Sequence, residues 1–342
     1  MVISALGIDL AKSVFQLHGV DERGRVVLTR QLSRGQLLEY IAKLPKCLIG
    51  MEACSGAHFW ARKFKTFGHD VRIIAPQFVK PYVKSNKNDR IDAEAICEAL
   101  TRPSMRFVSA KSIDQHDIQC IHRVRERLIS ARTALMNEIR GLLAEYGVVL
   151  PVGKSALLNR LSDLLEKAVS RSDMTTLSFT LFSEMHAELR ELDQRIGQLD
   201  DRIQALYDNH PVAQRIGQIP GVGPLTATAI VAATANPGDF KNGRQFSAWL
   251  GLVPRQNSTG GKNRLLGISK RGNVYIRKLL VHGARSAFIR MERHPDWKQT
   301  QWLKQLEVRR GVNRSVVALA NKNARRIWAV MAYEEEFKQQ CA

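Results

Sequence analysis

The chain has 342 residues, of which 44% are hydrophobic and 25% are charged, so it is predicted to fold around more than one core and is not a disordered protein. Its formal net charge of +20 favours a polyanionic partner, nucleic acid above all, and no long basic helix with an aromatic face points to a membrane surface. The five cysteines are widely spaced and include no C-x-x-C pair, which argues against disulfides and against a zinc site. The sequence has no leader-like start and no long apolar run, so we expect a cytoplasmic protein that is associated with the nucleoid when it is active.

Residues 1–110 are predicted to form one domain of mixed α/β structure. Three strands come first, then helices alternate with further strands, which is the order of a ribonuclease-H-like sheet. The predicted strands are residues 2–8, 13–20, 26–29, 47–51 and 71–75, and the predicted helices are 33–44, 57–67 and 89–100.

Four carboxylates stand at places where such a sheet can gather them. Asp9 ends the first strand, Glu52 ends the strand at 47–51, and Asp89 and Asp92 lie three positions apart on one face of a helix. Hard cations such as Mg²⁺ or Mn²⁺ prefer carboxylate ligands, and nucleic-acid cleavage needs metal positions left open for a phosphate. Taken singly, Asp9 is explained as a turn former at the end of a strand, and Asp89 and Asp92 as acids that favour the start of a helix. Together they predict a metal site.

Residues 111–210 are predicted to be helical. A helix at 115–146 carries an apolar stripe, with His122 and several arginines on the opposite face. A second helix repeats apolar residues in steps of three and four from Met185 to Leu206, which is typical of a coiled coil or a long helical hairpin, within one chain or between subunits.

Residues 211–342 are predicted to form a third, mainly helical region. Residues 219–224 look like the hairpin of a helix–hairpin–helix element, whose glycine amides can approach a phosphate. Residues 257–262 form a polar loop in which Ser258 or Thr259 is a candidate nucleophile toward a phosphodiester; on spacing alone, a phosphate-contacting loop without chemistry is the favoured alternative. The basic residues predicted to bind nucleic acid are Arg255, Lys262, Arg264, Lys270, Arg271, Arg277 and Lys278. A single C-terminal helix is predicted to carry Arg309, Arg310, Arg314, Lys322, Arg325 and Arg326.

Five ordered motifs now make the chain recognisable. They are GIDLAK at residues 7–12, MEACSG at 51–56, KNDRIDA at 87–93, IPGVGP at 219–224 and GLVPRQNSTGGK at 251–262. The sequence resembles the DEDD-type insertion-sequence transposases, also called bridge-RNA-guided recombinases, over nearly its whole length.

The resemblance implies a RuvC-like domain joined by a coiled coil to a transposase domain that bears a serine. It implies that Asp9, Glu52, Asp89 and Asp92 are catalytic and bind Mg²⁺, and that a hydroxyl of Ser258 or Thr259 attacks DNA to give a covalent intermediate. It also implies a structured guide RNA that pairs with donor and target DNA, and a dimer of dimers whose sites combine residues from different chains. In some relatives the serine directly precedes the first glycine of the loop, where this chain has Thr259. Ser258 is preferred because a primary hydroxyl is less hindered.

Two alternatives remain for the function. A Holliday-junction-resolving endonuclease would use water and the four carboxylates alone, so its nicking would survive loss of both hydroxyls. A non-catalytic RNA- or DNA-binding protein would keep its activity after Asp9→Asn. A sugar kinase or actin-type ATPase of the same fold is disfavoured, because no second glycine-rich phosphate hairpin is found and the net charge is wrong for it.

Overall fold

A computed structural model describes residues 2–84, 88–167, 174–295 and 298–337 of the chain. Two compact units are present. The first consists of Met1–Gln115 and Ala233–Gln245, and the second of His116–Ala232 and Phe246–Ala342. The segment Ala233–Gln245, where the chain returns to the first unit, is held there by hydrogen bonds. In one of them Ser109 Oγ donates to Asp239 Oδ1 at 2.7 Å. The division at residues 110 and 210 remains a prediction.

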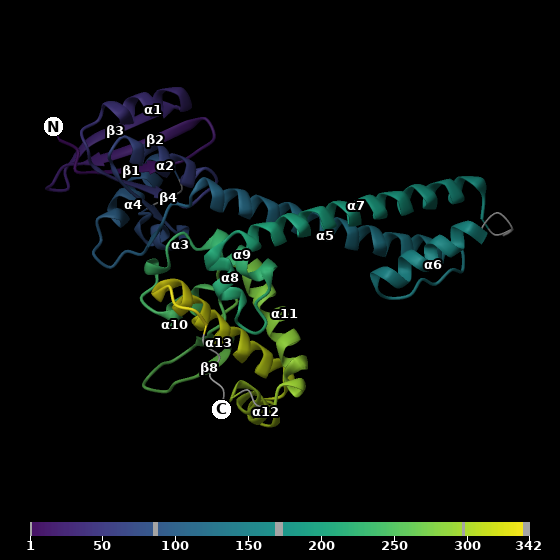
Figure 1. Cartoon of the computed structure of the whole chain (residues 1–342). Helices are drawn as coiled ribbons and strands as arrows, with labels where there is room; N and C mark the ends of the chain where they lie inside the picture. The colour runs from purple at the N-terminus through teal and green to yellow at the C-terminus, as the bar shows by residue number, and fades with distance from the viewer. Residues whose placement is uncertain (1, 85–87, 168–173, 296–297, 338–342) are drawn as a thin grey trace. The chain divides into compact units, whose positions relative to one another are not determined.

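A six-stranded sheet, formed by described residues, is the centre of the first unit, with strand order β3-β2-β1-β4-β5-β6 (Figure 1). Strands β1, β4 and β5 are parallel, whereas β2, β3 and β6 are antiparallel to their neighbours. The expected mixed α/β architecture is therefore confirmed, and it fits a ribonuclease-H-like sheet. The strands are β1 (Ala5–Asp9), β2 (Val14–Val20), β3 (Val26–Ser33), β4 (Leu48–Glu52), β5 (Asp70–Ile74) and β6 (Phe107–Val108).

Helices cover both faces of this sheet. Successive strand residues point to opposite sides, so the sheet contributes side chains to two cores. Residues such as Leu6, Ile8 and Met51 share a core with α1 (Arg34–Lys43) and α2 (Ala57–Thr66). The other face packs against α4 (Asp89–Leu100), with Ala5 and Ile74 in that core. The short helices α3 (Pro76–Val79) and η1 (Lys80–Tyr82) lie between β5 and α4 in the chain.

Glycines let α4 approach the sheet closely. Gly7 of β1 is paired with Gly50 of β4 in the parallel register. A Cβ atom at Gly7 would lie 2.3 Å from the carbonyl oxygen of Ala93 and 2.6 Å from the backbone nitrogen of Cys97, both in α4. No larger residue fits unless the helix moves, so Gly7 sets the distance between β1 and the helix that carries Asp89 and Asp92.

Long helices open the second unit: α5 (Ile113–Ala144), which begins in the first unit, and α7 (Thr176–Asp208) run side by side, with α6 (Lys154–Lys167) packed near their far end (Figure 1). The predicted heptad residues from Met185 to Ile203 are buried, and those as far as Leu199 share one core with α5 and α6. The periodicity therefore marks a hairpin within one chain. Helix α6 was not predicted.

The rest of the described chain is mainly helical. Figure 1 shows α11 and α13 side by side, with the small hairpin β7–β8 near α13. The predicted single C-terminal helix is wrong in one respect: it is divided at Gly311, whose φ of +78° interrupts helical geometry between α12 and α13. The elements are α8 (Pro211–Gly217), α9 (Pro224–Ala233), η3 (Pro237–Asp239), α10 (Gly243–Trp249), β7 (Pro254–Gln256), β8 (Leu265–Ile268), α11 (Val274–Arg290), η4 (Met291–Arg293), α12 (Lys298–Arg310) and α13 (Val312–Tyr333).

Among the helices formed by the described residues, none combines the length and the apolar character needed to span a bilayer.

Candidate active site: a carboxylate cluster and a hydroxyl-bearing hairpin

Three of the four predicted carboxylates gather at the end of β1. One carboxylate oxygen from each of Asp9, Asp89 and Asp92 lies within 4.8 Å of the others. Asp9 is the last residue of β1, and the two other acids occupy the first turn of α4, whose start is capped by Asn88 accepting from the Arg90 amide at 3.0 Å. The acids are thus placed by a buried strand and by a capped helix, which are rigid supports.

Glu52 lies next to this group but outside it. It ends β4, and the preceding residue Met51 is in register with Ile8 of β1, so Glu52 and Asp9 finish neighbouring parallel strands. Burial, with smaller contributions from the charges of Glu52 and Asp9, raises the pKa of the Cys54 thiol. Both carboxylates therefore act on the same nearby thiol, although Glu52 is not among the acids that approach one another within 4.8 Å.

The donor set suits a hard divalent cation. Mg²⁺ and Mn²⁺ take oxygen ligands, commonly one or two carboxylates completed by water and substrate phosphate. Three close carboxylates repel one another, and a cation would relieve that repulsion. Asp89 is exposed, while Asp9 and Asp92 are half-buried, so solvent or a phosphate can reach the cluster.

The predicted polar loop is the tip of a two-stranded hairpin. Strands β7 and β8 pair antiparallel, and a further bridge joins Thr259 to Lys262. Gly260 and Gly261 between them have φ values of +53° and +75°, as a tight type I′ turn requires, and the Lys262 amide donates to the Thr259 carbonyl at 3.0 Å. The two glycines thus serve the turn, which leaves the hydroxyl residues on its flank.

Ser258 takes part in a side-chain network that the sequence did not reveal. Its Oγ donates to Asn263 Oδ1 at 3.0 Å and accepts from Gln256 Nε2 at 2.8 Å. Gln256 Nε2 also lies 3.3 Å from Asn263 Oδ1. The hydroxyl of Ser258 is therefore held across the hairpin while the residue stays exposed. The side chains of residues 256 and 263 meet only because the hairpin brings its two strands together, so no local pattern could have identified them.

A half-buried arginine holds the base of the hairpin. Arg277 Nη1 donates to the carbonyls of Leu250 at 3.0 Å and Arg271 at 2.9 Å. Gly272 lies so close to Trp249 that a Cβ would meet its carbonyl oxygen at 1.8 Å. The segments before and after the hairpin are thus locked together, and Arg277 has a structural contact besides its predicted role in nucleic-acid binding.

The other predicted nucleic-acid-binding residues differ in their contacts. Lys278 forms an ion pair with Glu126 of α5 and lies 5.4 Å from the centroid of the Tyr275 ring. The remaining five are exposed on or beside the hairpin: Arg255, Lys262, Arg264, Lys270 and Arg271. Their role in binding remains a prediction.

His122 is buried, so its placement on the polar face of the helix at 115–146 was wrong. Its Nδ1 lies 3.0 Å from the Tyr275 hydroxyl and its Nε2 lies 3.0 Å from Thr228 Oγ1. The Thr228 hydroxyl donates to the Pro224 carbonyl at 2.7 Å, so it accepts from Nε2–H, and Nδ1 accepts from Tyr275. Burial, aided by Arg125, lowers the pKa of His122 to about 4. The ring is a neutral structural bridge.

The predicted helix–hairpin–helix hairpin lies at the connection between α8 and α9, and the assignment of that motif remains a prediction. Gly221 in the turn has φ +88° and packs on α11, where a Cβ would lie 2.6 Å from the Gly283 carbonyl oxygen. Asn323 of α13 donates to the Pro220 carbonyl at 2.8 Å. Gly221 is thus explained by packing, whereas Gly223 is exposed with open space around it. A role for this turn in phosphate binding remains a prediction.

A mixed α/β sheet with acidic residues gathered at the end of a central strand and the start of a neighbouring helix, in a chain of net charge +20, is typical of metal-dependent enzymes that act on nucleic acids. Comparison with known families agrees. Residues 213–301 match the model described as "Transposase IS116/IS110/IS902 family", and residues 6–148 match a DEDD-type model described as "Transposase".

Full-length relatives carry the same description. The chain is 49% identical over 335 residues to a "Probable family 20 transposase" of Pseudomonas aeruginosa, covering 98% of each chain. It is 46% identical over 336 residues to the "Transposase for insertion sequence element IS1111A" of Coxiella burnetii, covering 98% of this chain and 92% of the relative. It is 39% identical over 328 residues to the "Transposase for insertion sequence element IS1328" of Yersinia enterocolitica, covering 96% of each.

The chain belongs to the IS116/IS110/IS902 family of transposases: it is a DEDD-type insertion-sequence transposase, and its substrates are DNA. Membership of a DEDD-type family, together with the acidic cluster, suggests use of a divalent metal.

Proposed function

We propose that this transposase cuts and rejoins DNA strands with two chemical groups, a metal-binding acidic cluster and a serine nucleophile. The observation that carries the proposal is the convergence of Asp9, Asp89 and Asp92 within 4.8 Å at a strand end. Glu52, at the end of the adjacent strand, completes the set. Mg²⁺ or Mn²⁺ held there would neutralise charge on the phosphate under attack.

Ser258 is the proposed nucleophile. Its hydroxyl is exposed at the edge of a rigid turn and hydrogen-bonded on both sides, so its position is defined. The Oγ attacks the phosphorus of a DNA phosphodiester, a bond forms between serine oxygen and phosphorus, and the deoxyribose oxygen leaves with a proton. Attack by a second DNA hydroxyl then restores the serine and joins the new strands. Arg255 and Lys262, on the same hairpin, would stabilise the negative charge of the transferring phosphoryl group.

A direct test compares Ser258→Ala with Thr259→Ala in the full-length protein. Covalent protein–DNA adducts are separated on denaturing gels, and strand transfer is measured on DNA that carries the ends of the element. We expect Ser258→Ala to abolish both signals, and Thr259→Ala to retain them within about tenfold. Equal loss in both variants, or loss in neither, would contradict the assignment.

The same assay separates the alternative nuclease. Enzymes that activate water need no protein hydroxyl, so a Holliday-junction-resolving endonuclease would still nick DNA after both hydroxyls are removed, provided Mg²⁺ is present. We expect no nicking from the double variant. We also expect Asp9→Asn to lose metal-dependent cleavage, whereas a non-catalytic binding protein would be unaffected by that change.

The guide RNA and the assembly as a dimer of dimers are proposed from the resemblance and from the basic surface. The test is to purify the protein from cells and sequence the RNA that accompanies it. One discrete RNA transcribed from the element supports guided recombination, while random cellular RNA contradicts it. The heptad of α7 is covered within the chain by α5 and α6, so subunit contacts are expected elsewhere.

A further inference from the structure

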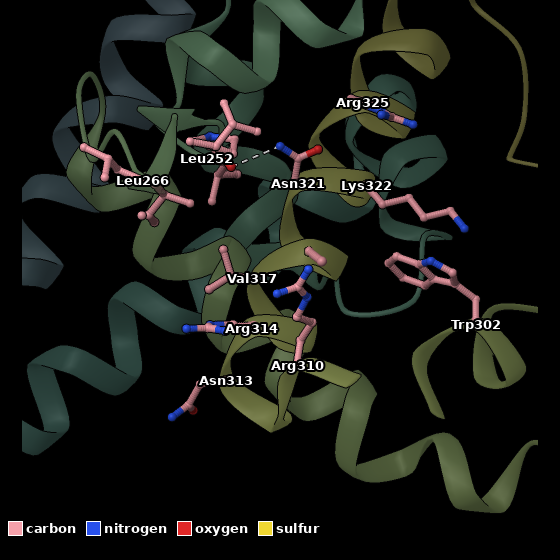
Figure 2. A pocket seen from close by; sticks show the side chains of 15 residues that line it. Leu252, Leu266, Trp302, Arg310, Asn313, Arg314, Val317, Asn321, Lys322 and Arg325 are labelled. Atoms are coloured by element: carbon pink, nitrogen blue, oxygen red, sulfur yellow. Dashed lines mark hydrogen bonds between the residues drawn. The ribbon is translucent and has the colours of Figure 1, made fainter. Parts of the chain in front are cut away.

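A groove in the second unit lies between the β7–β8 hairpin and helix α13 (Figure 2). Its volume is about 1050 Å³, slightly above the ~300–1,000 Å³ range of pockets that hold drug-sized ligands. The proposed catalytic chemistry uses none of the residues that line it. One wall is β8, which belongs to the hairpin that carries Ser258.

The opposite wall is one face of α13. Its lining residues recur in steps of three and four, as residues on a single helical face do, while the other face is buried in the core. Cations stand along this face, and small or apolar residues lie between them. The face includes Arg314, Val317, Ala318, Asn321, Lys322 and Arg325.

The charge of the groove is uniformly positive. None of the described residues that line it is acidic. Arg310, Arg314 and Arg325 make no ion pair with any residue in the described part of the chain. Lys322 lies 4.4 Å from the centroid of the Trp302 ring, and burial, followed by Arg326 and Arg325, lowers the pKa of its ammonium. Uncompensated cations of this kind attract a polyanion.

The side of the groove next to the hairpin is apolar and open. Leu265 and Leu266 of β8 are 66% and 39% exposed, and the half-buried Val317 and Ile268 add to the same surface. Leu252 also lines the groove but is only 2% exposed. Figure 2 shows Leu252 and Leu266 on the hairpin side of the groove, and Val317 of α13 next to Arg314. A duplex hides its bases and offers only phosphates to such a surface. An unpaired strand offers both phosphates and exposed base faces.

We propose that this groove binds a single-stranded segment of the DNA that is cut at Ser258, with phosphates on Arg310, Arg314 and Arg325 and bases on Leu265 and Leu266. The proposal rests on the proposed function. In the hairpin register Leu265 is paired with Gln256, two residues before Ser258. At ~3.3 Å per strand residue, the hydroxyl lies about 7 Å beyond that pair. This is at most about two nucleotides, since ~3.4 Å is the rise per nucleotide of a strand in a duplex and an unpaired strand can extend further; the occupant is therefore contiguous with the strand under attack.

The test measures DNA binding by fluorescence anisotropy with full-length protein that also carries Ser258→Ala. The probe is a thymidine oligonucleotide of about twelve residues, within the range of site sizes common for single-strand binding. The groove variant is Arg314→Ala/Arg325→Ala. The matched control is Lys304→Ala/Arg309→Ala, which removes two exposed cations of α12 that do not line the groove. All four side chains are exposed, so both variants should fold.

We expect the groove variant to bind roughly tenfold more weakly and to reduce the slope of log affinity against log salt by about 1.4, since each phosphate contact to a single strand contributes about 0.7. A decrease no larger than that of the control would overturn the proposal.

A second variant tests the apolar side. Binding by Leu266→Ser and by the protein with the unchanged groove is measured on two probes: the thymidine oligonucleotide and an abasic strand with the same number of phosphates. We expect the unchanged protein to prefer the strand with bases, and Leu266→Ser to lose that preference. Equal binding of the two strands by the unchanged protein refutes base contact. Tighter binding of a duplex, or an effect of the groove variants on RNA alone, refutes single-stranded DNA as the occupant.

These measurements also separate this proposal from the proposed function. Binding is measured without chemistry, because Ser258→Ala is present throughout. If Ser258 is not the nucleophile, the groove still binds the probe. If the groove is not a binding site, covalent adduct formation still depends on Ser258.

Discussion

Replacing Gly7 by alanine tests whether close packing of α4 on β1 positions the carboxylates. The new Cβ would lie 2.3 Å from the Ala93 carbonyl oxygen, whereas Cβ contacts under 3.0 Å essentially never occur, so α4 must retreat by at least 0.7 Å (3.0 − 2.3 = 0.7). The obstructing atoms belong to the backbone and cannot rotate away. Asp92 directly precedes Ala93, so the retreat separates it from Asp9.

The magnitudes follow from this displacement. Overpacking a well-packed core costs about 1–3 kcal/mol, so Gly7→Ala should lower the free energy of unfolding by that amount. A misplacement of about 1 Å at a reacting group can reduce a rate on the order of a hundredfold. We therefore expect a large loss of metal-dependent DNA cleavage in a protein that still folds, together with weaker Mn²⁺ binding.

Two other glycines provide controls. Gly35, in α1 of the same unit, has no atom within 4 Å of a built Cβ, so Gly35→Ala should leave cleavage unchanged and stability equal or slightly higher. At Gly50 the obstruction is the side chain of Leu100, with a closest approach of 2.9 Å, which can adjust more easily than backbone. Gly50→Ala should have an intermediate effect. If the rate of metal-dependent DNA cleavage by Gly7→Ala lies within twofold of the rate of Gly35→Ala, the reasoning is refuted.

Two further predictions concern the second unit. The pKa of His122 is about 4 in the folded protein, below its ordinary value of 6.5, so between pH 4 and pH 6.5 only the unfolded chain binds a proton at this ring. The contribution of the neutral ring to the free energy of unfolding is therefore fully present above pH 6.5, and the free energy of unfolding falls by about 3 kcal/mol by pH 4. Urea unfolding should show this pH dependence in the wild type and not in His122→Gln, and identical dependence in both would contradict the buried neutral ring. Arg277→Met removes the hydrogen bonds to Leu250 and Arg271, so adduct formation at Ser258 should fall about tenfold or more. A reduced slope of log affinity against log salt in the same variant would show that Arg277 also contacts phosphate, as the sequence predicts.

The positions of the acids could be predicted because each depends on local sequence. An apolar run that ends at Asp9 or Glu52 predicts a strand with an acid at its tip, and the three-residue spacing of Asp89 and Asp92 fixes their common face once a helix forms. The structure confirms the strands and the helix. It places Glu52 beside the group of three and not within it, because that distance depends on how β4 and α4 pack.

Other features depend on contacts between distant residues. The arginine-rich helix at 115–146 predicted a polar face for His122, but α9 and α11 cover this residue, as its bonds to Thr228 and Tyr275 show. The heptad of α7 was compatible with contacts inside or between chains. Its burial against α5 and α6 shows contacts inside the chain. The periodicity alone could not show this, because it specifies an apolar stripe and says nothing about the partner of that stripe.

The sequence by itself therefore determined the class of fold, the candidate acids and the candidate hydroxyls, because strand, helix and turn preferences act over a few residues. Only the tertiary structure decided how Ser258 is held by Gln256 and Asn263, why Gly7 must be glycine, and that α13 and β8 enclose a basic groove. These features arise where segments far apart in the chain pack together, and no local pattern encodes which surfaces will meet.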